Sequence, residues 1–119
     1  MVPHHPARDQ IELANVLSAL GNPLRLTIVR VLAETGERPC GQVGTYLGEG
    51  ISKSTLTHHW RVLRDAGVIW QQPAGRENLL TLRKEDLDAR FPGLLDSVVA
   101  GIGDLAQAGP GRPAPRAGR

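Results

Sequence analysis

The sequence contains little cysteine, few aromatic residues and no long apolar run. Its single cysteine, Cys40, excludes an internal disulfide framework and favours a reducing compartment. No apolar stretch approaches the roughly 20 residues that span a bilayer, and the first residues show no signal-peptide pattern. We therefore expect a cytoplasmic protein that has no membrane partner.

The sequence also lacks the residue combinations on which enzymes depend. It has no Gly-rich phosphate loop and no nucleophile–base pair with an orienting group. The acidic residues Glu85, Asp86 and Asp88 stand at the start of a predicted helix, where they suit the positive end of the helix dipole. We expect a protein that is not an enzyme and that binds no cofactor.

Charge is present but unevenly distributed. The formal net charge is only +2. Residues 52–84 nevertheless carry six cations against two acids, whereas residues 9–51 and 85–108 together carry four cations against ten acids. A cationic third on an otherwise acidic body favours a face that binds a polyanion, although chance clustering on a solvated surface gives the same pattern.

Apolar periodicity and capping residues predict five helical segments and one hairpin. Asn22 is an N-cap followed by a proline, and Ser52 is the N-cap of a helix that ends at Gly67. Pro92 and Gly93 fall inside the last segment, where they kink or restart the helix. The predicted helices cover residues 9–20, 22–35, 40–47, 52–66 and 84–108, and the hairpin strands cover 68–72 and 77–82.

These elements imply three parts of the chain. We expect a flexible arm at residues 1–8, one folded domain at residues 9–108, and a disordered Gly/Pro/Ala/Arg tail at residues 109–119. A short helix, a glycine turn and a capped helix, followed at once by a basic hairpin, are typical of a winged helix-turn-helix. The predicted fold class is therefore mainly α with a small β-hairpin wing.

The helix after Ser52 has two chemically different faces. At about 100° per residue, Trp60 and Leu63 lie within about 40° of Leu56 and face the core. The opposite face carries Ser54, His58 and Arg61, with Thr57 at its flank, and has no carboxylate before Asp65. Such groups donate to phosphates or read base edges in a major groove, whereas a merely solvated helix face usually mixes acids with bases.

Two further arginines extend this predicted DNA face. Arg64 lies about one turn from Arg61, so the pair can bridge a base edge and the backbone. Arg76 stands at the Gly-led tip of the hairpin, where a cation enters the adjacent minor groove or binds phosphate. An ordinary solvated turn arginine is the alternative at position 76.

Three stretches of sequence and the hairpin tip carry the features of a known family. They are residues 20–26 (LGNPLRL), 52–60 (SKSTLTHHW) and 63–69 (LRDAGVI), and the pair Gly75-Arg76. In these residues the chain resembles the ArsR/SmtB winged helix-turn-helix repressors, over about residues 10–105. Two departures are a turn before Ser52 that is a couple of residues longer than usual, and Trp60 in place of the usual aliphatic residue.

The resemblance implies where DNA and a second copy bind. It implies that Lys53, Ser54, Thr57, His58 and Arg61 contact DNA, with Arg76 on the wing. It also implies dimers joined by the first and last helices, and the long apolar last helix is hard to bury in so small a monomer. The residues expected in the dimer interface are Leu13, Val16, Leu17, Leu94, Leu95, Val98, Val99 and Ile102.

The metal-sensing motif of many relatives is missing. Aligned with the Cys-x-Cys pair of those relatives, the two ligand positions are occupied by Pro39 and Gly41, which cannot bind a metal. Cys40 is interpreted as a small buried residue or as a redox-sensing thiol. The metal-binding alternative is a site that combines Cys40 with His4 and His5 of the arm. His58 and His59 are adjacent on a helix, so they cannot easily chelate one ion. We predict no metal site.

The predicted function is sequence-specific regulation of transcription. We expect a homodimeric repressor on double-stranded, near-palindromic operator DNA, released by an unknown signal other than a metal ion, for which a small-molecule effector is the natural candidate. Two alternatives stay open. One is a winged-helix module that binds protein and no DNA, and the other is a metal- or redox-sensing repressor that uses Cys40.

Overall fold

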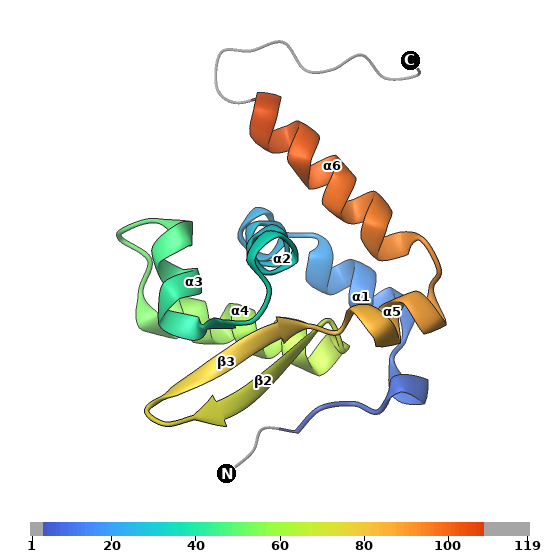
Figure 1. Cartoon of the computed structure of the whole chain (residues 1–119), viewed down its shortest axis with the longest axis horizontal. Coiled ribbons are helices and arrows are strands. Elements are labelled where there is room, and N and C mark those ends of the chain that lie inside the picture. The colour runs from blue at the N-terminus through green and yellow to red at the C-terminus, as the bar shows by residue number, and fades with distance from the viewer. Residues whose placement is uncertain (1–3, 109–119) are drawn as a thin grey trace.

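The computed structural model describes residues 4–108, and side chains are described for residues 4–102. The chain forms a 3-10 turn and nine regular elements (Figure 1). In order they are the turn at Arg8–Gln10, α1 (Leu13–Leu20), α2 (Pro23–Thr35), β1 (Arg38–Pro39), α3 (Cys40–Leu47), α4 (Lys53–Ala66), β2 (Ile69–Ala74), β3 (Glu77–Leu82), α5 (Lys84–Arg90) and α6 (Leu94–Ala108). The predicted fold class, mainly α with a small β wing, is confirmed. The predicted tail at residues 109–119 lies outside the described residues.

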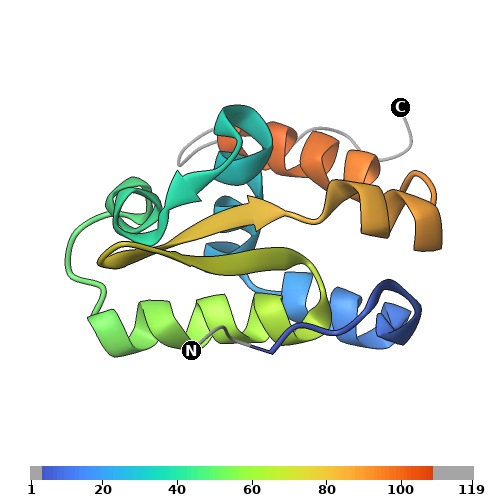
Figure 2. The ribbon, with the colours of Figure 1, turned by 60° about the horizontal axis from the view of Figure 1, so that its bottom comes forward.

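A small antiparallel sheet separates two groups of helices. Its strand order is β1–β3–β2, so β3 is central and both neighbours are edge strands. In Figure 2, α4 and α1 lie on one side of the hairpin and α6 lies on the other, while α2 passes behind the hairpin and contacts both α1 and α6. The hairpin extends along α4, which places the wing beside the N-terminal half of that helix (Figure 2).

The helix predicted to start at residue 9 begins later. Ile11 and Glu12 are extended, and α1 starts only at Leu13. The reason is tertiary packing: the Ile11 side chain is fully buried and lies against Gly67, where an added Cβ would come within 2.6 Å of an Ile11 carbon. Gly67 ends α4 at a φ of 88°, so this position needs glycine both for its backbone and for its contact.

The remaining boundaries agree with the capping residues, with one difference. Asn22 Oδ1 accepts the backbone N–H groups of Leu24 and Arg25 at 2.9 and 3.2 Å, which starts α2. The last predicted helix restarts at Pro92 and Gly93, as expected: Gly93 adopts a φ of 83° between α5 and α6. The difference is β1, which was not predicted.

The hairpin turns over two residues. Ala74 pairs with Glu77, so Gly75 and Arg76 form the loop. Gly75 has a φ of 67° and Arg76 does not have a positive φ, which is the pattern of a type II′ turn. This turn places the Arg76 side chain at the exposed tip of the wing.

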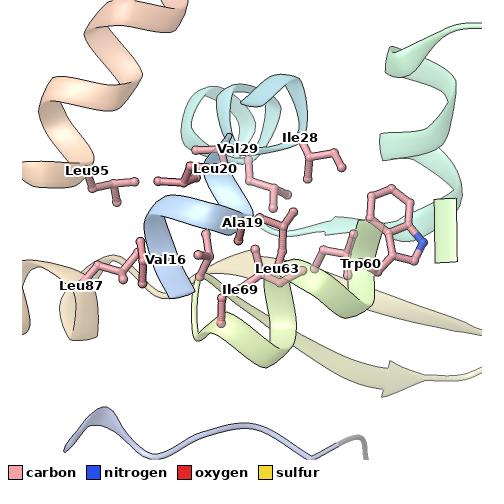
Figure 3. Close-up of a cluster of buried hydrophobic side chains, with 14 of the residues drawn as sticks. Val16, Ala19, Leu20, Ile28, Val29, Trp60, Leu63, Ile69, Leu87 and Leu95 are labelled. Atoms are coloured by element: carbon pink, nitrogen blue, oxygen red, sulfur yellow. The ribbon is translucent and has the colours of Figure 1, made fainter. Parts of the chain in front are cut away.

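The core is aliphatic apart from one indole. Figure 3 shows side chains from five helices and β2 converging on one cluster. Its labelled members are Val16, Ala19, Leu20, Ile28, Val29, Trp60, Leu63, Ile69, Leu87 and Leu95. Trp60 is 5% exposed, so its predicted inward position is confirmed. Among the described residues no single helix is long and apolar enough to cross a bilayer; α1 and α2 meet that test only as a pair, bent by 100°.

The described part of the predicted arm lies against the wing. His5 Nε2 accepts the backbone N–H of Gln71 at 2.9 Å, on the outer edge of β2. The His5 ring also packs on Trp70 with ring centroids 5.1 Å apart. The imidazole thus covers a backbone donor that an edge strand leaves open.

Arg83 joins this arm to α5. It is 2% exposed, its guanidinium stacks on Trp70, and it donates to the Pro6 carbonyl at 2.8 Å. Its charge is balanced by Asp86, which also receives Arg8 at 2.7 Å. Burial acts to raise the pKa of Asp86, but hydrogen bonds from the two arginines outweigh it and hold that pKa below its ordinary value.

Candidate nucleic-acid interface

The outward face of α4 is a polar surface with exposed cations. Lys53, Ser54, Thr57, His58 and Arg61 are all exposed, and they line one shallow groove of about 600 Å³. The first turn of α4 contains no acidic residue. The positive end of the helix dipole and the cations therefore act in the same direction, towards an anionic partner.

The N-terminus of α4 is held by its own hydroxyls. Ser52 Oγ accepts the backbone N–H of Thr55 at 3.1 Å and lies 3.2 Å from Ser54 Oγ. This cap fixes the first turn, from which Lys53 and Ser54 project. The cap predicted from the sequence is confirmed.

The wing brings a further cation to the same side. Arg76 lies across a cleft of about 510 Å³ from Lys53 and Thr57. The cleft is lined by Cys40, Gly41, Lys53, Leu56, Thr57, Trp60, Gln71, Arg76, Glu77 and Asn78. Within residues 4–102, Lys53, Arg61 and Arg76 form no hydrogen bond or ion pair with another protein group. Their charges are thus available to a ligand.

Arg64 differs from the other predicted DNA-contacting residues. Its side chain is only 18% exposed. Its Nη1 donates to Gln71 Oε1 and its Nε to Asp65 Oδ1, both at 3.2 Å. Helical spacing placed Arg64 correctly one turn from Arg61, but the guanidinium turns towards β2. Arg64 joins α4 to the wing and is therefore not a free cation of the predicted face.

Glu77 is an acid beside the cationic wing tip, and the structure explains its presence. Its Oε1 accepts the backbone N–H of Gly41 at 3.1 Å, at the N-terminus of α3. There the carboxylate satisfies a helix donor and faces the positive end of the dipole. A Cβ at position 41 would lie 2.5 Å from the same oxygen, so glycine leaves room for this contact. The contact ties the wing to α3.

The two adjacent histidines of α4 have different surroundings. His58 is exposed, whereas His59 is only 6% exposed and its Nδ1 lies 3.1 Å from Arg25 Nη1 on α2. Burial first, then the charge of Arg25 and then His58 hold the pKa of His59 below its ordinary value. Sequence reasoning missed this contact, because 34 residues separate its partners.

The residues considered for metal binding do not gather. Cys40 is half-buried at the start of α3, and Pro39 is paired with Leu79 in the sheet. His5 is engaged at β2. Among the described residues no group of three or more His, Cys, Asp or Glu side chains could hold a metal ion. The absence of a metal site in the protein stays a prediction.

The expected dimer residues divide into two sets. Val16, Leu95 and Ile102 are at most 6% exposed and belong to the core of the protomer, so they offer little surface to a partner. Leu13 and Leu17 are 45% and 49% exposed. Half-buried positions on α6 complete the set that stays accessible: Leu94, Val98 and Val99.

Comparison with known proteins places the chain in a family. The helix-turn-helix domain family matches residues 20–71, which run from the end of α1 into β2. An uncharacterized HTH-type transcriptional regulator of Bacillus subtilis, YceK, is 34% identical over 91 residues, or 76% of this chain and 88% of that protein. The chain belongs to the helix-turn-helix transcriptional regulators. The predicted function as a transcriptional regulator is thereby confirmed.

Solved structures agree with the regulator in fold. The crystal structure of the transcriptional repressor BigR from Xylella fastidiosa has a TM-score of 0.57 and 27% identity, covering 74% of the regulator and 83% of that chain. The homodimeric winged helix-turn-helix DNA-binding domain of a possible ArsR-family regulator from Mycobacterium bovis has a TM-score of 0.59 and 20% identity, covering 98% and 99%. The predicted resemblance to the ArsR/SmtB winged helix-turn-helix proteins is confirmed at the level of the fold.

Proposed function

We propose that the regulator binds double-stranded operator DNA through α4 and the wing. The observation that carries this proposal is the shared exposure of Lys53, Arg61 and Arg76. Among the described residues that line the α4 groove and the wing cleft, the one carboxylate, Glu77, is engaged with α3. Ser54, Thr57 and His58 supply the short polar groups that read base edges. Arg64 donates to Gln71 and so supports this face from behind. We do not assign it a direct contact with DNA.

Binding to DNA is tested most directly by its salt dependence. We expect the affinity for a labelled mixed-sequence duplex to fall linearly on a log–log plot with salt, with a slope of about −5 if about six phosphates are neutralised. Fluorescence anisotropy between about 50 and about 200 mM salt measures this slope. Absence of binding at the lowest salt would favour the alternative, a winged-helix module that binds protein.

We further propose that the regulator acts as a homodimer. Leu13 and Leu17 of α1 and the half-buried α6 residues Leu94, Val98 and Val99 are apolar side chains that remain accessible on the protomer, and we assign them to the dimer interface. A twofold dimer through this surface presents two α4 helices to successive major grooves, about 34 Å apart. Its operator is then a near-palindrome.

Leu17→Glu is expected to shift the protein to monomers. The change places a charge on a surface that the dimer removes from water, and each lost leucine contact weakens the dimer, so its dissociation constant should rise at least roughly tenfold. Analytical ultracentrifugation measures the shift. Asn15→Glu is the matched control, because it adds the same charge on α1 about 160° around the helix. Equal dissociation in both variants, or a monomeric wild type, would contradict the proposed interface.

The mode of regulation we propose is repression in the cytoplasm, relieved by a small-molecule effector and not by a metal ion. BigR is a repressor of 27% identity, and this likeness supports repression here. The regulator then acts by binding and release, without catalysis and without a cofactor. Genome-wide mapping of its bound sites identifies the operator and the regulated genes, and an increase in transcript levels on deletion of the gene tests repression.

A further inference from the structure

Arg25 connects three helices at one point. Its backbone N–H is capped by Asn22 at the start of α2, and its Nε donates to the Ala19 carbonyl of α1 at 2.6 Å. Its Nη1 reaches His59 Nδ1 on the inner face of α4 at 3.1 Å. The guanidinium thus ties the end of α1 and the start of α2 to the middle of α4, one residue from His58 on the exposed face.

The contact requires a neutral imidazole. A guanidinium has donors and no acceptor, so His59 Nδ1 must carry a lone pair and the ring proton must be on Nε2. The titratable or charged groups that act on this ring are Arg25 of α2 and His58 of the same helix. The helix α1 and the strand β2, which also pack on α4, contain no ionisable side chain. No carboxylate from these elements is placed to stabilise a protonated His59.

We infer that Arg25 is a positioning residue for the recognition helix, which it holds through neutral His59, and that protonation of His59 lowers the selectivity of the regulator for its operator. The inference rests on the proposed DNA-binding function. Two cations 3.1 Å apart in a buried site repel each other, so the imidazolium loses the Arg25 contact. Hydrogen bonds to base edges depend on the position of α4, whereas long cationic side chains follow phosphates over a wider range of positions.

Acidification should therefore act on both DNA binding and stability through His59. Protonation of His59 displaces the α4 face that reads bases. Because the pKa of His59 is lower in the folded than in the unfolded state, stability is full above about pH 6.5 and falls as pH decreases from there towards the folded-state pKa.

The experiment compares two labelled duplexes from about pH 8 to about pH 5.5 by anisotropy. One is an operator selected by the wild type from a random library, and the other has a mixed sequence. The proteins are the wild type, Arg25→Leu, His59→Asn and His58→Asn. Asparagine at position 59 keeps an acceptor near the position of Nδ1 but does not titrate.

In the wild type, the ratio of operator to mixed-duplex affinity should fall roughly tenfold on acidification. His59→Asn should keep the ratio high and make it independent of pH, and Arg25→Leu should lower it at every pH. His58→Asn should retain the fall of the ratio. An equal pH dependence in wild type and His59→Asn would overturn the inference, as would an Arg25→Leu protein that is folded and fully selective.

A second measurement does not depend on DNA. Nitrogen NMR of the free protein should show His59 as the Nε2–H tautomer and should follow its titration. A wild type that binds no DNA would refute the proposed function while leaving this measurement decisive for the Arg25–His59 contact. A Nδ1–H tautomer, or a pKa unaffected by Arg25→Leu, would refute the contact even if DNA binds.

Discussion

Arg61→Ala is expected to weaken binding to the operator by roughly 10- to 100-fold, and to weaken binding to mixed-sequence DNA much less. Arg61 is exposed in the groove of α4, about one turn beyond Thr57 and His58, and it has no partner among residues 4–102. A bidentate arginine contact to a base contributes about 1–3 kcal/mol of discrimination. Titration of the same two duplexes with wild type and variant measures both losses.

A cation elsewhere in the fold provides the matched control for Arg61. Arg38 lies in β1, which β3 separates from β2, and it is not among the residues that line the α4 groove or the wing cleft. Arg38→Ala removes the same charge and should leave both affinities within about twofold, because Arg38 lines neither surface and charges that do not contact DNA are largely screened by salt. Equal losses of both duplexes in Arg61→Ala would show that Arg61 contacts phosphate alone.

Trp60→Ala is expected to lower the free energy of unfolding by about 3–5 kcal/mol. The indole is 5% exposed and packs beside Leu63 and Ile28 in the cluster of Figure 3, so truncation leaves a large cavity under the α4 face. Small domains have only about 5–15 kcal/mol of stability in total, so the variant should be close to unfolding. Urea denaturation followed by far-UV circular dichroism measures the difference.

Two variants help to interpret the Trp60 result. Tyr46 is 58% exposed on α3, so Tyr46→Ala removes an aromatic ring with an expected change within about 0.5 kcal/mol. Trp60→Leu keeps an apolar side chain and should cost less than alanine, because the cavity is smaller. A loss below about 1 kcal/mol in Trp60→Ala would contradict the burial of this side chain.

Local signals in the sequence predicted most of the secondary structure. Asn22 and Ser52 cap α2 and α4 with the hydrogen bonds that their side chains predict, and Gly75 forms the turn of the wing. These signals work because a cap or a turn is satisfied within three or four residues of chain. The same reasoning missed β1, since a strand of two residues that includes Pro39 exists only through its pairing with β3.

Periodicity located the candidate site but did not determine which group each side chain contacts. It placed Ser54, His58 and Arg61 on one face of α4 with Thr57 at its flank, and the family resemblance added Lys53. The structure brings all five to one groove. Periodicity could not show that Arg64 turns to Gln71, seven residues further along the chain, because helical spacing gives the direction of a Cβ and not the partner of a guanidinium. The apolar pattern of α1 and α6 likewise did not separate core residues from accessible ones.

The sequence by itself determined a capped helix whose outward face is cationic and has no carboxylate before Asp65, beside a turn that carries Arg76. It also determined that Cys40, the one cysteine, stands between Pro39 and Gly41, which cannot bind a metal. Only the tertiary structure decided that Glu77 occupies the space beside Gly41 and that Arg25 meets His59. The reason is distance along the chain: these partners lie 36 and 34 residues apart, and only the packing of the helices and the wing brings them together.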